Sequence, residues 1–472
     1  MSDSKSSFRV IVVGAGVSGL AAAHALQKAG IDHVVLERRS VVAPPEGASI
    51  AMYPHGSRIL HQFGCLDAIK KHCNPPGRWV ARLPSGKAIA NNGVFRVLEK
   101  NHGSGLLLIE RRQFLQELYD TLPDKSTIKT GRAIKDIKQD DKGVEVILND
   151  GEIERGDLVL GCDGVYSTVR SIMWDHANAS TPGLISVKEK LTIRADWKCL
   201  VVMTNEVPEL GRRDLTVVHN KDYSHMFTMT EKHGYFFVFF RLDKPCTWPN
   251  RPRYTDQDAQ ELADRIANHP ISDTVVFGEV WKRRIRANVV NLEEGVLDHW
   301  FHGRIALAGD SVHKVTPNMA FGGNSGIESI AVLVNHLRRM LLETNQSKLT
   351  ADLLEQTLAA YQGERVDRMK QIMEFSGEIT RVQAWHTAKD KFMANWLVPL
   401  LPDSFFGDQL GRLIAGAPKL DFVDAEDFPS GNMRWKDAIN VASLQPQKEG
   451  YSPPSRLGWA SAMAAFIMVV YM

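Results

Sequence analysis

Residues 8–23 read FRVIVVGAGVSGLAAA, an apolar run that ends in Gly-x-Gly-x-x-Gly and continues into alanine. A strand, a tight turn and a helix in this order open a dinucleotide-binding βαβ unit. We expect Gly14 to permit the turn, Gly16 to let a pyrophosphate approach the backbone, and Gly19 to bring the helix close to the strand. The N–H groups at the helix start then face the phosphates.

A second predicted strand, residues 33–36, ends at Glu37, roughly 20 residues after the last glycine. A carboxylate at this place accepts hydrogen bonds from ribose hydroxyls and would repel a 2′-phosphate. The sequence therefore predicts FAD or NAD, rather than NADP, as the resident nucleotide. The chain has no second complete Gly-x-Gly-x-x-Gly unit, which is consistent with one resident nucleotide.

The composition of the chain argues against several classes of function. The chain has 472 residues, enough for two or three domains, and a net charge of +2 with Lys and Arg mixed among Asp and Glu. No basic stripe points to nucleic acid. The 5 cysteines are scattered and form no Cys-x-x-Cys pair, so we expect neither a zinc site nor a disulfide framework. Residues 1–7 are polar and predict no secretory signal.

The other end of the chain is apolar. Residues 457–472 carry no charge and follow a Pro- and Ser-containing linker, residues 445–456. They are fewer than the roughly 20 residues that span a bilayer. We expect a membrane anchor or interfacial helix; the alternative is a last helix docked on the core. The anchor predicts a membrane-associated protein, with its catalytic part facing the cytosol at the endoplasmic reticulum.

Two further segments distinguish FAD from NAD. Residues 157–164 form an apolar strand that ends in Asp163-Gly164, and residues 304–310 form another that ends in Gly309-Asp310. An Asp at a strand end accepts hydrogen bonds from the ribityl hydroxyls of a flavin. The glycine-rich residues 322–326, with Gly323, precede a helix whose N-terminus suits an anionic reduced flavin. Small residues from Gly47 to Ala51 allow close approach of a ligand.

At these motifs the chain resembles the class A FAD-dependent monooxygenases, which have the p-hydroxybenzoate hydroxylase fold. The match runs from about residue 8 to about residue 380, with the motifs in the family's order. It implies that FAD is held by Gly14, Gly16, Gly19, Glu37, Gly47, Ala51, Asp163, Asp310 and Gly323. An Arg-x-x-Leu helix start is also implied to contact the flavin. Both Arg111 and Arg112 fit its register, and Arg111 is our assignment.

Within that family the chain is most similar to fungal membrane-anchored FAD epoxidases of meroterpenoid and indole-diterpene biosynthesis. The residues behind this likeness are 109–112, 161–165, 319–324 and the apolar tail. The likeness implies that NAD(P)H reduces the flavin, that O2 adds to it as a C4a-hydroperoxide, and that one oxygen reaches a double bond. The partner would be a lipophilic small molecule, with no metal and no nucleic acid.

The resemblance also implies an α/β fold with a Rossmann-like FAD-binding domain, a mostly antiparallel β-sheet substrate domain and a helical C-terminal part. The boundaries that we expect divide the FAD-binding domain into two parts, residues 1–186 and 291–385. The substrate domain takes residues 187–290, with further strands near 75–110. Residues 386–444 form the helical C-terminal part, before the linker and the apolar tail.

Candidate catalytic residues come from the expected substrate sheet. In relatives an Arg and a Tyr in this sheet position the substrate or the peroxide, and Arg194 and Tyr223 fit that description. His313 follows the Gly309-Asp310 motif and is better explained as a structural histidine. Three alternatives to epoxidation stay open: hydroxylation of a phenolic compound, reduction of an isoprenoid alkene by the flavin without oxygen, and a non-enzymatic FAD-binding scaffold.

Overall fold

The computed structural model describes residues 8–344 and 350–437. The predicted linker and apolar tail, residues 445–472, lie outside the described residues. Within the described ranges, no helix combines the length and the apolarity that crossing a membrane requires.

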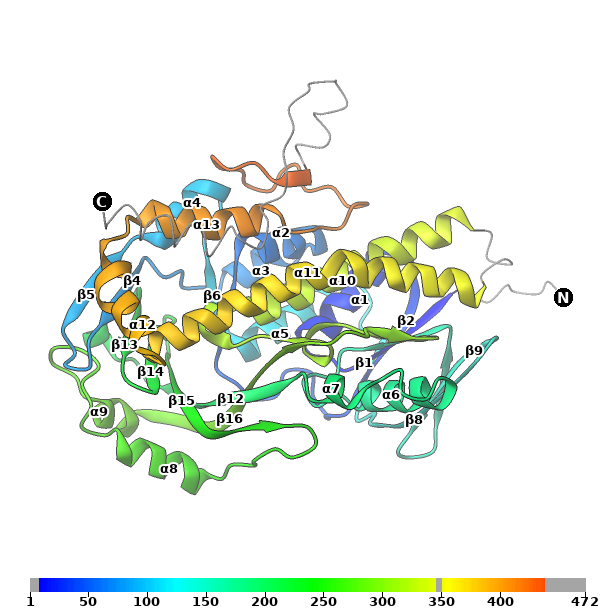
Figure 1. Ribbon diagram of the computed structural model, residues 1–472. Helices are drawn as coiled ribbons and strands as arrows, with labels where there is room; N and C mark the ends of the chain where they lie inside the picture. The colour runs from blue at the N-terminus through cyan, green and yellow to red at the C-terminus, as the bar shows by residue number, and fades with distance from the viewer. Residues whose placement is uncertain (1–7, 345–349, 438–472) are drawn as a thin grey trace.

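The opening strand lies inside a six-stranded sheet (Figure 1). From edge to edge its strands are β17 (Phe301–His302), β18 (Ile305–Leu307), β11 (Leu158–Gly161), β1 (Arg9–Val13), β2 (Asp32–Glu37) and β7 (Ile128–Thr130). All neighbours are parallel except β17 and β18. The continuous apolar run of β1 is explained by burial on both faces, because helices cover one face and a small sheet packs against the other.

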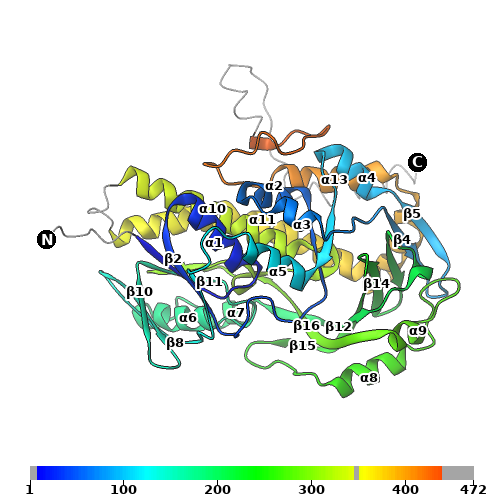
Figure 2. The ribbon, with the colours of Figure 1, turned by 180° about the vertical axis from the view of Figure 1, so that it is seen from behind.

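Two smaller sheets and a layer of helices complete the first domain. The three-stranded sheet contains β8 (Ile134–Asp140), β9 (Gly143–Leu148) and β10 (Ile153–Gly156), and a two-stranded ribbon pairs β3 (Ser49–Met52) with β6 (Leu107–Glu110). The helices of this part are α1 (Val17–Ala29), α2 (Pro54–Phe63), α3 (Leu66–Lys70), α4 (Val94–His102), α5 (Arg111–Asp120), α6 (Thr168–Ser180) and α7 (Val187–Lys190). Figure 2 shows the molecule from behind, with the three-stranded sheet that contains β8 and β10 next to α6.

The second domain is built on an eight-stranded sheet. Its order is β19 (His313–Lys314), β16 (Arg284–Val296), β12 (Arg194–Thr204), β15 (Gly234–Thr247), β14 (Tyr223–Met229), β13 (Asp214–His219), β4 (Arg78–Arg82) and β5 (Ala88–Asn92). Only β13 and β4 are parallel, so the mostly antiparallel substrate sheet is confirmed. The short helix η1 (Pro208–Leu210) follows β12, and α8 (Asp256–Arg265) and α9 (Phe277–Lys282) cover the outer face.

The aromatic side chains of β15 alternate between the two faces of this sheet, as strand geometry requires. Phe236 and Phe240 are buried in the outer core with α8 and α9. Phe237 and Phe239 face the other way and line the main cavity. One face of this aromatic group therefore lines the cavity, and the other belongs to the outer core.

Two long helices follow, and the second of them also contacts the large sheet. They are α10 (Phe321–Glu343) and α11 (Ala351–Gln383), which run side by side through the molecule (Figure 1). The glycine-rich residues 322–326 were expected to precede this helix, and this is wrong because they form its start. Ala320 takes the left-handed conformation (φ 54°) and the helix begins at the next residue, so Gly323 lies in its first turn rather than in a preceding loop.

The C-terminal part is helical, as predicted. After α11 come α12 (Ala388–Phe392), a π-helical turn η5 (Met393–Leu397), a 3-10 turn η6 (Val398–Leu400) and α13 (Asp403–Ala415). Helix α13 packs along α4, and η6 contacts β5 at the edge of the large sheet.

Candidate active site

The glycine-rich turn between β1 and α1 shows why each glycine is needed. A Cβ on Gly14 (φ 98°) would lie 2.7 Å from the carbonyl oxygen of Cys162, and a Cβ on Gly19 would lie 1.8 Å from the carbonyl oxygen of Gly14. Both positions therefore require glycine, because neighbouring backbone atoms leave no room for a side chain. Gly16 differs, because no atom of the described part of the chain lies within 4 Å of its Cβ position and it lines the main cavity. The space above Gly16 is where the pyrophosphate is expected.

Glu37 lies at the end of β2 and is 6% exposed. One carboxylate oxygen accepts a hydrogen bond from the Ala15 N–H (2.7 Å) and the other from the Arg39 N–H (2.9 Å). These bonds hold the carboxylate beside the glycine turn. Each oxygen retains acceptor capacity for a ribose hydroxyl.

Asp163 has a structural task that the sequence motif did not reveal. It accepts hydrogen bonds from the Ser167 hydroxyl (2.6 Å) and from the N–H groups of Thr168 (2.7 Å) and Val169 (3.1 Å). Burial raises the pKa of this carboxyl group, against the effect of these donors. Asp163 therefore caps α6, while the adjacent Gly164 (φ 84°) lines the cavity.

Asp310 lies in η2 (Gly309–Ser311) and lines the cavity, where it pairs with Lys314. A Cβ on Gly309 (φ 68°) would lie 2.3 Å from the Ser18 hydroxyl oxygen, so glycine is required for the turn to approach α1. Sequence reasoning missed Lys314, which places a cation beside the acid predicted to accept from the ribityl chain. Their (i, i+4) spacing was the available signal.

The first turn of α10 enters the same cavity through Gly322 and Gly323. A Cβ on Gly323 would lie 2.8 Å from Ile50 Cδ1, so β3 approaches the helix closely here. The short helix η3 (Pro317–Met319) precedes this turn and also lines the cavity. Two helix N-termini, those of α1 and α10, thus meet one cavity.

Asn324 fixes the position of this helix start. Its side-chain amide donates to the carbonyl oxygens of Ala51 and Ala320, both at 2.9 Å, and its oxygen accepts from the Tyr53 N–H at 3.0 Å. A Cβ on Gly56 would lie 2.4 Å from that oxygen. The predicted contact residue Ala51 lines the cavity and is held by this amide.

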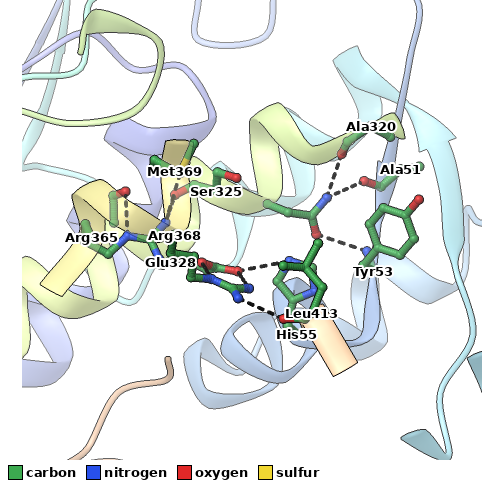
Figure 3. Close-up of polar contacts among 12 residues, drawn as sticks. Ala51, Tyr53, His55, Ala320, Ser325, Glu328, Arg365, Arg368, Met369 and Leu413 are labelled. Atoms are coloured by element: carbon green, nitrogen blue, oxygen red, sulfur yellow. Dashed lines mark hydrogen bonds and ion pairs between the residues drawn. The ribbon is translucent and has the colours of Figure 1, made fainter. Parts of the chain in front are cut away.

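Behind Asn324, a buried ionic cluster joins α2, α10 and α11 (Figure 3). Glu328 is fully buried and accepts from Arg365 (2.6 Å) and from two nitrogens of Arg368 (both 2.8 Å), and His55 Nε2 lies 3.2 Å away. Burial alone would raise the pKa of Glu328, but the charges of Arg368 and Arg365 lower it overall. The cluster therefore holds the carboxylate ionised beneath the first turns of α10.

The structure separates the two candidate arginines. Arg111 lines the cavity, whereas Arg112 is exposed on the next position of α5. Burial lowers the pKa of Arg111, and the nearby Asp310 opposes that shift. Gly47 (φ 81°) lies against the same side chain, since its Cβ position is 3.0 Å from Arg111 Cδ. Arg111 is therefore the arginine that a cofactor can meet.

This placement predicts opposite results for two matched substitutions. Arg111→Ala should weaken FAD binding about tenfold to a hundredfold, because a charge-assisted hydrogen bond contributes about 1.5–3 kcal/mol. Arg112→Ala should leave the dissociation constant unchanged. Fluorescence titration of the flavin-free protein with FAD measures both, and equal losses would contradict the assignment.

The cavity has a volume of about 490 Å³ and two ends. The cofactor end is formed by the loops described above. The substrate end lies between the large sheet and helices α4, α11 and α13, and its wall is mainly apolar: Pro76, Trp79, Val94, Phe95, Leu215, Met226, Phe237, Phe239, Phe375, Ile379, Val382, Ala394, Val398, Phe406 and Leu410.

His219 brings a polar group to the substrate end. Its Nδ1 lies 3.1 Å from the backbone carbonyl oxygen of Gln383, which requires a proton on Nδ1. Nε2 then carries a lone pair, and no group among the described residues hydrogen-bonds to it. Burial lowers the pKa of His219 to about 4, so the ring is neutral at pH 7. Sequence reasoning missed this residue, which no local motif marks.

Arg194 and Tyr223 do not reach this cavity. Arg194 is exposed at the start of β12 and pairs with Asp196 (2.9 Å), on the surface. Tyr223 hydrogen-bonds His269 on the outer face of the sheet, and burial raises its pKa to about 12. Their placement gives no support to a catalytic role in this cavity. His313 is buried against Trp300, and its Nε2 lies 2.8 Å from the Ser329 hydroxyl, in agreement with a structural role.

The cofactor end fits FAD. Gly16 leaves room at one helix N-terminus, Arg111 supplies a cation, and Asp310 with Lys314 supplies an acceptor and a donor beside a second helix N-terminus. Within the described residues, no group of three or more metal-ligating side chains could hold a metal ion.

Comparisons with known proteins agree with this geometry. A family model described as an FAD binding domain matches residues 7–376. The chain is 41% identical over 442 residues to the FAD-dependent monooxygenase DEP2 of Alternaria brassicicola, covering 93% of this chain and 83% of that one. It is 34% identical over 421 residues to the FAD-dependent monooxygenase atmM of Aspergillus flavus, covering 89% and 87%.

Solved structures share the fold. Klebsiella pneumoniae HpxO, complexed with FAD and uric acid, matches with a TM-score of 0.69 at 19% identity, covering 87% of this chain and 97% of that one. Pseudomonas aeruginosa PqsL, in complex with 2-aminobenzoylacetate, matches with a TM-score of 0.64 at 19% identity, covering 82% and 98%. The chain belongs to the class A FAD-dependent monooxygenases and is related to fungal enzymes of that family.

Proposed function

We propose that this monooxygenase uses NAD(P)H and O2 to epoxidise a prenyl or terpenoid double bond of a lipophilic secondary-metabolite intermediate. The observation that carries the proposal is the lack of charge at the substrate end of the cavity. Among the described residues that line it, the charged side chains are Arg111, Asp310 and Lys314, and all three lie at the cofactor end.

An uncharged wall favours an apolar substrate over a phenolic acid. A bound carboxylate would lose its hydration without a cation to replace it, which is costly in an apolar site. Apolar surface buried against Trp79, Phe237 and Phe239 instead favours binding at about 25 cal/mol per Å². This argues for the epoxidase over hydroxylation of a soluble phenolic acid.

The reaction balances without a side chain that removes a proton from the substrate. An alkene, O2, NAD(P)H and a proton give an epoxide, water and NAD(P)⁺; one oxygen atom forms two C–O bonds and the other leaves as water. FAD supplies the activation of oxygen when bound. The apolar wall orients the alkene and excludes water, and neutral His219 retains an acceptor at Nε2 for a hydroxyl group of the substrate.

The test uses the purified full-length protein, FAD, NADPH and a geranylgeranylated indole under isotopically heavy O2, with salicylate as the comparison substrate. We expect a product that has gained one heavy oxygen atom from the prenylated compound and none from salicylate. Hydroxylated salicylate would instead support the phenolic hydroxylase. Loss of an alkene without oxygen gain, under anaerobic conditions, would support the flavin-dependent isoprenoid reductase.

A further inference from the structure

The segment from α12 to η6, residues 388–400, has two opposite apolar faces. Phe392, Trp396 and Leu400 are 61%, 67% and 79% exposed. Ala394 and Val398 lie between them in sequence and line the substrate end of the cavity. A spacing of four residues places the first three on one side of a helical turn, and an offset of two places the others on the opposite side.

This segment is therefore a wall one helix thick between the cavity and the outside. Figure 1 shows α12 at one end of the molecule, far from β9. The wall is continued by α13, whose Phe406 and Leu410 also line the cavity. The same short stretch thus touches the substrate space on its inner face and presents a large apolar surface on its outer face.

Soluble proteins rarely expose three large apolar side chains side by side without a partner. The charges around this patch indicate which partner fits. Lys389 and Lys391 are exposed at its N-terminal edge, with the Lys391 ammonium 4.9 Å from the centre of the Trp385 ring. Asp390 accepts from the backbone N–H and hydroxyl of Thr387, and Asp403 is exposed at the C-terminal edge. Residues 392–402 carry no charge. Lysines beside an apolar stripe that contains tryptophan match an anionic lipid surface.

We propose that Phe392, Trp396 and Leu400 insert into the outer layer of a phospholipid bilayer, with Lys389 and Lys391 at the headgroups. The substrate end of the cavity then lies directly behind the bilayer surface, where a lipophilic substrate dissolves. The link between the bilayer and a lipophilic substrate rests on the proposed function; the insertion of the three side chains into the bilayer does not.

The test is quenching of tryptophan fluorescence by vesicles of brominated phosphatidylcholine and phosphatidylserine, with the full chain and no substrate. Trp396→Phe keeps the face apolar but removes the reporter, so the quenched share of the fluorescence should fall measurably below that of the wild type. Trp248→Phe is the matched control, because Trp248 is 43% exposed and packs against Trp174 of α6, which Figure 1 shows far from α12, and its quenched share should not fall.

An unchanged quenched share in Trp396→Phe would overturn the proposal, because Trp396 would then not meet lipid even if another part of the chain did. Sedimentation of the wild type as a dimer that Trp396→Ser converts to a monomer, without lipid quenching, would overturn it in favour of a second copy of the chain. Failure of the epoxidation assay would leave this result unaffected, so the two proposals are separately testable.

Discussion

Gly16→Val is expected to yield a folded protein that purifies without FAD. The Cβ position of Gly16 has open space within 4 Å, so the substitution meets no protein atom near the backbone. It does fill the space over the N-terminus of α1 where the pyrophosphate must approach. Weakening of the helix N-cap adds about 1 kcal/mol of destabilisation, too little to unfold the chain.

Two measurements separate loss of the cofactor from loss of the fold. The flavin released on heating reports FAD content, and circular dichroism reports folding. Gly363→Val is the matched control, because Gly363 also has nothing within 4 Å of its Cβ position but lies exposed on α11. The control should retain FAD in full. A Gly16→Val protein that keeps its FAD would place the pyrophosphate elsewhere.

Glu328→Gln is expected to cause the largest loss of stability. Glu328 is the shared partner of Arg365 and Arg368, and Arg365 is 1% exposed. Neutralising the acid leaves buried positive charge without compensation, which costs about 3–5 kcal/mol. The midpoint of thermal unfolding should fall accordingly, and FAD should bind more weakly because the first turns of α10 lose their support.

The control for this substitution is Glu364→Gln on α11. Glu364 pairs with His336 at 2.9 Å, but its side chain is 51% exposed, and exposed pairs contribute about 0–1 kcal/mol. Its melting temperature should stay close to that of the wild type. Equal decreases in the two variants would show that the buried cluster is not a major source of stability.

The sequence alone predicts the position of a feature when that feature depends on residues close together in the chain. The turn from Gly14 to Gly19 and the strand end at Glu37 are short-range patterns, so their positions could be predicted. The choice between Arg111 and Arg112 could not, because both start the same helix. It depends on where α5 stands relative to β3, and that is set by pairing of β3 with β6.

The surroundings of other residues could not be predicted, because they depend on contacts between segments far apart in the sequence. Tyr223 lies on a predicted strand, but only the packed sheet shows that its side chain faces α8 and α9 rather than the cavity. His219 presents an acceptor nitrogen to the cavity only because the end of α11 places the Gln383 carbonyl oxygen beside its other ring nitrogen. Asp163 stays a predicted cofactor residue; its hydrogen bonds to the nearby start of α6 add a capping role, which the motif did not mark.

The central claim is that the cavity between the two helix N-termini holds FAD, and flavin analysis of the purified full-length protein tests it most directly. Heat-released flavin should be FAD, in a ratio of one per chain, because we expect the Gly16 turn and Glu37 to bind the nucleotide half of the cofactor. FMN in its place, or a protein that stays colourless after incubation with FAD, would contradict the account.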